Sequence, residues 1–191
     1  MKCDSAAVVS YEVDADGRIV EVCEHWWPFA RDNQAPELHP DLVLGKPLMG
    51  YIADDTSRYL YGQLMARTRA SGGIVEVDIR CDSPDKRRFL KIRLSALSGG
   101  TILFESRTLR EESRPPVALL DRSLPRSPEW ICICSWCKRI RVGPDWLEVE
   151  QAMAESRILQ MPQPPQMTHG MCPTCYQAAR GARPSTPSEG T

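Results

Sequence analysis

Two cysteine pairs constrain this chain more than any other feature of its sequence. Cys134 and Cys137 form one C-x2-C pair, and Cys172 and Cys175 form a second. Each pair can place two thiolates on one ion through a tight turn, so that four sulfurs complete the tetrahedron of a structural zinc site. The sequence therefore predicts a zinc-binding module in the C-terminal part of the chain, with these four cysteines as ligands.

The distribution of all eight cysteines also favours a metal over a disulfide framework. Five of the eight lie between residues 132 and 175, and the others stand at 3, 23 and 81. The segment between the two pairs is about twice as long as usual, but doubling a loop costs only about 0.6 kcal/mol in closure entropy. Zinc binding contributes roughly 10–16 kcal/mol in structural sites. The long segment therefore does not argue against the site, while an iron centre, disulfides and free thiols stay open as alternatives.

The charge balance does not indicate a particular class of binding partner. Lys and Arg together number 24 and Asp and Glu 25, for a formal net charge of −1. Such a chain has no overall electrostatic reason to bind nucleic acid or an anionic membrane. No apolar run approaches the roughly 18 residues needed to span a bilayer. We therefore expect a cytoplasmic protein with no membrane partner.

The first 110 residues have the pattern of an α+β domain. Alternating apolar residues over 9–13 and 19–22 flank a turn at 14–17, which predicts a β-hairpin. Apolar residues at helical spacing predict a helix over 55–70, capped by Asp54 or Asp55 and stopped by Gly72 and Gly73. Three further alternating runs, at 75–79, 90–94 and 101–105, predict strands. Five antiparallel strands with the helices on one face of the sheet follow from this order.

This order of elements resembles the PAS sensor-domain family over about residues 6 to 108. The motifs that carry the resemblance are Asp-Gly-Arg-Ile-Val at 16–20 and Gly-Lys-Pro-Leu-Met-Gly-Tyr-Ile at 45–52, which leads into the acidic-capped helix. The resemblance implies a small-molecule ligand of unknown identity. The candidate ligand-binding residues are His25, Trp26, Trp27 and Phe29, although aromatic core packing explains these four residues equally well.

Composition divides the chain near residue 111. Only five of the 16 prolines precede it, and the other 11 follow residue 114. We expect a PAS-like domain over 1–110, a Pro-rich linker over 111–128, a zinc-binding module over 129–180 and a disordered tail over 181–191. Within the module, apolar spacing predicts a short helix over 148–158, with Trp146 as its main apolar anchor.

A second resemblance covers the predicted module. Its motifs are Cys-Ser-Trp-Cys-Lys-Arg-Ile-Arg at 134–141, Trp146, Val149-Glu150, and Thr-His-Gly-Met-Cys-Pro-Thr-Cys at 168–175. In this order they look like the cysteine-rich tail found after PAS or GAF domains in bacterial signalling proteins. The resemblance implies zinc ligation by Cys134, Cys137, Cys172 and Cys175. It leaves His169 either as an alternative ligand or as a partner that holds a coordinating thiolate.

The sequence contains no recognisable catalytic set. It has no Gly-rich phosphate loop and no nucleophile elbow, and its only histidines are His25, His39 and His169. We therefore expect a non-enzymatic bacterial sensor or adaptor with a structural zinc, acting by contact with a protein partner or a second copy of itself. Two alternatives are a thiol-disulfide redox protein and a nucleic-acid-binding zinc ribbon. The second is disfavoured, because six basic and five acidic residues over 126–180 are too balanced for phosphate binding.

Overall fold

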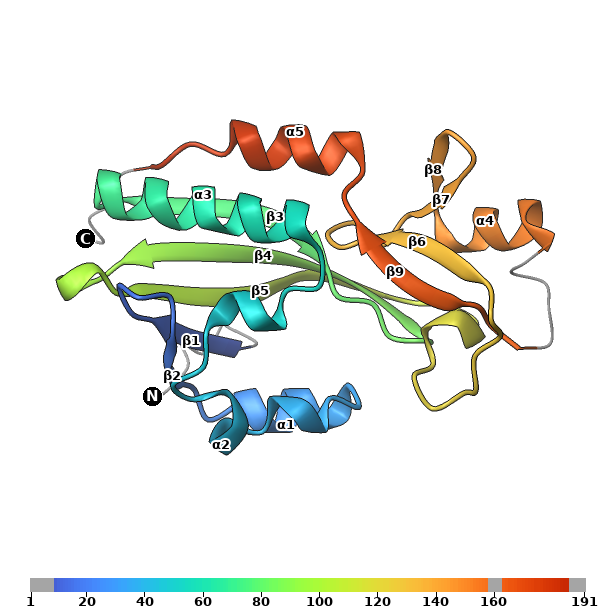
Figure 1. Cartoon of the computed structure of the whole chain (residues 1–191), viewed down its shortest axis with the longest axis horizontal. Helices are drawn as coiled ribbons and strands as arrows, with labels where there is room; N and C mark the ends of the chain where they lie inside the picture. Colours follow the sequence, from blue (N-terminus) through green and yellow to red (C-terminus); the bar gives the residue numbers. More distant parts are fainter. Residues whose placement is uncertain (1–8, 158–162, 186–191) are drawn as a thin grey trace.

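Two β-sheets organise the chain (Figure 1). The computed structural model describes residues 9–157 and 163–185. The first sheet has five antiparallel strands in the order β2-β1-β5-β4-β3, and the second has four in the order β8-β7-β6-β9. The strands are β1 Val9–Val13, β2 Ile19–Val22, β3 Ile74–Arg80, β4 Lys86–Ala96, β5 Ile102–Ser113, β6 Trp130–Cys134, β7 Ile140–Val142, β8 Asp145–Leu147 and β9 Gln166–Gly170.

Helices occupy the segment between the two halves of the first sheet and flank the second sheet. The α-helices are α1 Trp26–Asp32, α2 Pro40–Val43, α3 Asp55–Ser71, α4 Val149–Glu155 and α5 Pro173–Gly181. Short 3-10 turns lie at η1 Pro36–Leu38, η2 Leu48–Tyr51, η3 Ser98–Gly100 and η4 Ala118–Leu120. The α+β class, the hairpin and the five-stranded antiparallel sheet are thus confirmed, although β4 and β5 run well beyond the predicted strands.

The strand register explains why this sheet buries only one face. Tyr11 lies opposite Phe104, which in turn lies opposite Leu94, and Leu94 lies opposite Val75. Side chains at such paired positions share one face of a sheet. Three of these four are fully buried, whereas the neighbouring positions on the other face carry charges such as Glu76 and exposed residues. The inner face is therefore the apolar side on which the helices pack.

The longest helix, α3, packs on this inner face and shows the expected end signals. The carboxylate of Asp54 accepts a hydrogen bond from the backbone N–H of Ser57 at 2.8 Å, which is an N-cap. Gly72 ends the helix with φ +63°, a left-handed conformation that favours glycine. Along the helix, Leu60 and Leu64 are buried, and the Tyr61 ring lies 6.5 Å from that of Phe104. The predicted helix over 55–70 is confirmed.

The second sheet is a feature that the sequence reading did not foresee. β6 pairs with β7 in antiparallel and with β9 in parallel orientation, so the two cysteine pairs are joined by a sheet. A separate apolar cluster, with Ile133, Ile140 and Val149 at its centre, packs under α4. The predicted helix over 148–158 is shorter in the structure, because α4 ends at Glu155, and residues 158–162 lie outside the described part of the chain.

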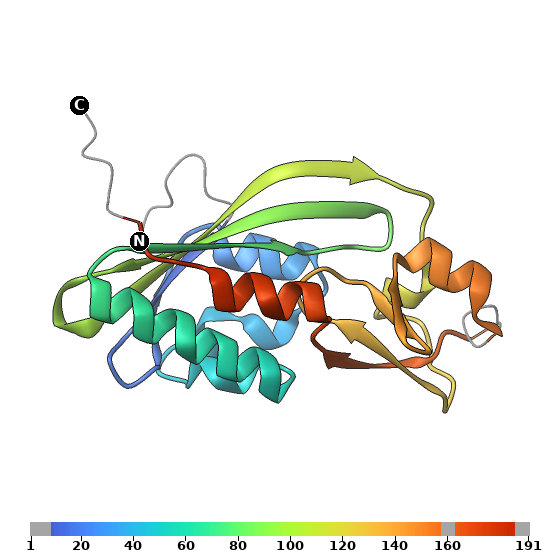
Figure 2. The same cartoon turned by 90° about the horizontal axis from the view of Figure 1, so that it is seen from above.

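The segments around the predicted linker pack closely on the rest of the fold. β5 continues to Ser113, past the expected boundary at 111, and Val117 and Leu119 are buried in the apolar cluster of the second sheet. α5 lies alongside α3 in both views (Figures 1 and 2), and Ser185 pairs with Ile74 at the start of β3. The predicted tail therefore begins with residues 181–185 in contact with the first sheet, and residues 186–191 lie outside the described part.

Candidate metal centre

Four thiols meet where the two sheets join. The Sγ atoms of Cys134, Cys137, Cys172 and Cys175 all lie within 4.8 Å of one another. The Sγ atoms of Cys137 and Cys172 are 3.7 Å apart. Four sulfurs at about 2.3 Å from a central zinc ion would lie about 3.8 Å apart, by tetrahedral geometry. The cluster thus has the donor type, the number of donors and the spacing that a tetrahedral metal ion requires.

The first pair sits on a tight turn at the end of β6. The N–H of Cys134 donates to the carbonyl of Arg139 at 2.7 Å, and the N–H of Lys138 donates to the carbonyl of Cys134 at 3.1 Å. Lys138 adopts φ +62°, which is unusual for a residue other than glycine, and its ammonium donates to the Ser135 carbonyl at 2.7 Å. This turn brings the two sulfurs of the pair to the same side.

The second pair forms the beginning of α5. Cys172 is the N-cap residue, and its Sγ accepts a hydrogen bond from the N–H of Cys175 at 3.4 Å. Pro173 occupies the first helical position, where the missing N–H is not needed. The N–H of Cys172 also donates to Sγ of Cys134 at 3.4 Å. Backbone donors thus face the sulfurs of both pairs, which stabilises thiolate charge.

The close approach of the sulfurs shifts the pKa values of three of the four thiols in opposite directions. Hydrogen bonds from Cys137 and Cys175 hold the pKa of Cys134 far below its usual value. The same contact with Cys134 raises the pKa of Cys137 to about 12 and that of Cys175 well above its usual value. A bound divalent cation would stabilise the cysteines of the cluster as thiolates.

The Ser-Trp turn between the first two cysteines fastens the metal centre to the five-stranded domain. The Ser135 hydroxyl donates to the same Asp54 carboxylate that caps α3. Trp136 is buried, and its ring meets that of Tyr61 on α3 edge to face at 6.1 Å. The carbonyl of Trp136 accepts the N–H of Arg80 at 2.6 Å. The centre and the first sheet therefore share one apolar cluster.

An ion network makes a second connection between the two sheets. Asp82, whose side chain is 1% exposed, pairs with the buried guanidinium groups of Arg80 and Arg114. Arg80 also reaches Glu148 at 2.6 Å, and Arg114 reaches Glu150 at 3.4 Å, so both arginines contact the beginning of α4. Two buried cations around one buried carboxylate form a network in which each charge needs the others.

His169 lies beside the metal centre but is not part of the cluster found among the described residues. It is on β9, exposed, and lines a polar hollow with Asp54 and Arg58. Partial desolvation of the ring and the charge of Lys138 lower its pKa, although the charge of Asp54 acts in the opposite direction. Cys132, a free thiol, lies against the next residue on β9: a Cβ on Gly170 would meet its sulfur at 2.9 Å. Any other residue here would require the Cys132 sulfur to shift.

The structure places the four predicted ligand-binding aromatic residues at different sites along α1. Trp26 packs edge to face on Tyr11, and its indole N–H donates to the Leu38 carbonyl at 2.7 Å. Trp27 stacks edge to face on His39, and His25 is exposed. Phe29 lines a large pocket. The contacts of Trp26 are those of a core residue, and its role in binding a ligand stays a prediction.

The sequence reading missed the residues that connect the two sheets. Arg80 reads as an outward strand residue by alternation, and Asp82 as part of a turn. Their burial depends on α4, whose position cannot be derived from local patterns. The tryptophan inside a C-x2-C turn was the one available signal, because a large apolar ring beside a metal knuckle requires a surface on which to pack.

Comparison with known proteins supplied no relative: neither a protein-family model nor a curated protein matches the chain. Within the described residues, none of the helices has the length and apolar character that crossing a membrane requires.

Proposed function

We propose that this protein is a bacterial signalling sensor or adaptor, with a PAS-like domain and a structural zinc site, that acts through protein contacts. The observation that carries the proposal is the attachment of a four-sulfur cluster to the main helix of the five-stranded domain. Ser135 and Trp136, which lie between two of the sulfurs, contact Asp54 and Tyr61 at the beginning of α3. Metal binding and helix packing are thereby linked.

The chemistry of the donors supports zinc in a structural role. Four thiolates satisfy a tetrahedral ion completely and leave no open position for water or substrate. Soft sulfur donors select zinc or iron over hard cations such as Mg²⁺ and Ca²⁺. Arg139 lies next to the cluster and stays charged, because its hydrogen bond to Glu148 raises its pKa. A permanent cation at this place offsets part of the negative charge of a tetrathiolate site.

The order of the elements supports the PAS-like assignment. Two strands, a group of short helices, one long helix and three strands follow one another along the chain, and the two halves join through β1 and β5. This is the order on which the resemblance in the sequence rests. The cytoplasmic location, the protein partner and the small-molecule ligand are parts of the same proposal.

Metal analysis and native mass spectrometry of protein purified without added metal would test the proposal. We expect one zinc per chain, retained in the native spectrum, and a defined oligomer or a co-purified small ligand. A metal-free protein in which the cysteine pairs cycle between thiol and disulfide would instead support a redox protein. Retention on DNA that falls steeply with salt would support a nucleic-acid-binding ribbon. Either result would overturn the proposal.

A further inference from the structure

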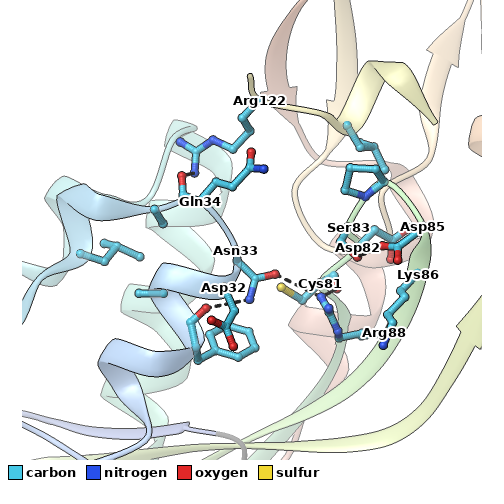
Figure 3. Close-up of a pocket in the computed structure, with 16 residues that line it drawn as sticks. Asp32, Asn33, Gln34, Cys81, Asp82, Ser83, Asp85, Lys86, Arg88 and Arg122 are labelled. Atoms are coloured by element: carbon cyan, nitrogen blue, oxygen red, sulfur yellow. Dashed lines mark hydrogen bonds between the residues drawn. The ribbon is translucent and has the colours of Figure 1, made fainter. Parts of the chain in front are cut away.

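A pocket of about 610 Å³ lies where the five-stranded domain meets the segment that leads to the metal module. We call it the seam pocket. Figure 3 shows that one wall comes from the end of α1 and the residues after it, and the opposite wall from the turn between β3 and β4. Leu120 and Arg122, which follow β5, complete it. Its volume is within the range of roughly 300–1,000 Å³ that small-molecule sites occupy.

The lining combines an apolar surface with polar groups from three separate segments. Phe29, Ala30, Ala35, Leu38 and Leu120 contribute apolar atoms. Gln34, on the same wall, has φ +56°, a left-handed conformation that is uncommon for glutamine and fixes the chain reversal after α1. An apolar surface with a few converging polar groups is the usual composition of a site for a small organic molecule.

Three cationic side chains line the pocket, and they come from two different segments of the chain. Lys86 and Arg88 come from β4, and Arg122 from the segment after η4. Lys86 and Arg88 pair with Glu111, and Arg122 with Glu37; neither glutamate lines the pocket. The carboxylates that pair with these cations therefore lie outside the pocket lining, whereas the cations themselves are part of it.

Three acids line the pocket beside the three cations. Asp82 is already held by the two buried guanidinium groups of Arg80 and Arg114. Asp85 is exposed and bound to the Ser83 hydroxyl at 3.0 Å, and Asp32 pairs with Arg31 on the surface. Because acids and cations are equal in number, selection of an anion depends on a basic side chain that has a donor without an acceptor.

Arg88 offers a donor group for an anion. Its side chain is 18% exposed; its Nε donates to Glu111, and its Nη1 donates to Asn33 on the opposite wall at 3.1 Å. Its Nη2 group makes no hydrogen bond to any of the described residues. Nη2 is not among the fully buried side-chain atoms that lack a partner, so it is open to an added acceptor, and a carboxylate is the acceptor that fits a guanidinium group best.

We propose that the seam pocket binds a small organic carboxylate with an apolar body. The carboxylate accepts from Nη2 of Arg88 and from Lys86, and the body lies on Phe29, Leu38 and Leu120. The inference rests on the proposed sensor function and names the class of its ligand. A molecule bound here touches α1, the β3–β4 turn and the segment after β5 together, so its presence changes how the five-stranded domain meets the metal module.

Calorimetric titration of the zinc-loaded full chain with 2-naphthoate would test this inference, with the uncharged 2-naphthamide as the matched probe. We expect saturable binding of one 2-naphthoate per chain. A charge-assisted hydrogen bond discriminates by roughly tenfold to a hundredfold, so the amide should bind weaker by that factor. Arg88→Gln should weaken 2-naphthoate to the level of the amide. Arg93→Gln, an exposed position of the same strand outside the pocket, should leave both affinities unchanged.

A second variant keeps the test decisive if Arg88→Gln fails to fold. Leu120→Glu places a carboxylate on the apolar surface, and its negative charge should lower the affinity for 2-naphthoate by at least about tenfold. Three results would each overturn the proposed carboxylate binding. They are equal affinity for the acid and the amide, unchanged binding in both folded variants, and no binding at millimolar concentration. Zinc measured on the same samples separates the two proposals: a zinc-loaded protein without binding overturns only the seam pocket, whereas a metal-free protein overturns the proposed function.

Discussion

The two sheets of this molecule are stabilised in different ways. The five-stranded sheet buries a continuous apolar face, with Leu94, Ile102 and Phe104 fully buried and α3 packed over them. The four-stranded sheet has a smaller apolar cluster of its own, made largely of Ile131, Ile133, Ile140 and Val149. Small apolar clusters contribute little net stability, so such a module depends on additional links. The four sulfurs supply one such link.

The comparison also shows that the metal centre serves both sheets. Cys134, Trp136, Cys172 and Ala179 belong to the apolar cluster of the five-stranded domain, although they lie in the C-terminal part of the sequence. Arg67 on α3 donates to three carbonyls at the end of α5, among them that of Ala179. A division of the chain near residue 111 into two independent folding units stays a prediction, which the following experiments test.

The largest effect is expected from Cys134→Ser. The change removes one of four zinc ligands, and the roughly 10–16 kcal/mol of apparent zinc-binding free energy supports the fold of the module. We expect loss of stoichiometric zinc, and loss of hydrogen-exchange protection in β6 to β9. If the two sheets are independent, β1 to β5 keep their protection. If they are one unit, α3 loses protection as well.

Cys81→Ser is the matched control for this experiment. Cys81 is a free thiol outside the metal cluster, and burial raises its pKa, so it is a neutral thiol at pH 7. Its replacement should leave zinc at one per chain. Undiminished zinc in Cys134→Ser, measured beside this control, would disprove the assignment of the ligands.

The second largest effect concerns the ion network between the sheets. Asp82→Asn leaves the buried guanidinium groups of Arg80 and Arg114 without their shared counter-charge, and breaking a buried pair in this way costs about 3–5 kcal/mol. Asp78→Asn, at an exposed pair with Lys91, should cost less than about 1 kcal/mol. Urea unfolding of both variants checks the difference. Equal midpoints would mean that the network does not hold the sheets together.

A smaller effect is expected at Trp26, which tests the aromatic residues of α1. Trp26→Phe removes the hydrogen bond to the Leu38 carbonyl and part of the contact with Tyr11, at a cost of about 2 kcal/mol. Zinc content should not change. Thermal unfolding beside Tyr59→Phe, an exposed position on α3, provides the measurement. An unchanged stability combined with altered ligand binding would mean that Trp26 belongs to a binding site and not to the core.

Sequence patterns were sufficient wherever local chemistry determines the structure. The Asp54 cap, the Gly72 stop and the alternation of β1 to β5 were predicted, because caps and strand alternation depend on neighbouring residues. The four cysteines were brought together as their spacing indicated. The second sheet was not predicted, because β6 and β9 are parallel strands about 30 residues apart, as their bounds show. Parallel pairing of this kind leaves no local turn signal.

The same limit applies to the pockets. Lys86 and Arg88 belong to a short run of basic residues, and nothing in the sequence around them indicates that they line a pocket. Their partners, Glu111 on β5 and Asn33 after α1, are distant in the sequence and become neighbours only through the sheet register and the position of α1. The seam pocket is therefore a property of tertiary packing, and no spacing rule could have indicated it.

The smallest effect is expected where the two regions share a single hydrogen-bonded carboxylate. Asp54→Ala removes both the cap of α3 and the acceptor of the Ser135 hydroxyl, and the loss of a cap costs about 1 kcal/mol. Burial would raise the pKa of Asp54, but the hydrogen bonds from Ser135 and Ser57 outweigh it and lower the pKa below the usual 3.8. A carboxyl with a lowered folded-state pKa stabilises the fold at neutral pH, and this contribution is lost as the pH falls through that pKa.

Urea unfolding of the wild type and Asp54→Ala between pH 7 and pH 3 measures this contribution, since zinc release at low pH affects both proteins and cancels in the difference. We expect the two curves to converge below pH 3.8. Ser135→Ala, which keeps the cap, should show only part of the effect at pH 7. In a double-mutant cycle, a coupling between the two positions means that the turn of the metal centre stabilises α3. Strict additivity would mean that the two sheets touch at this point without supporting each other.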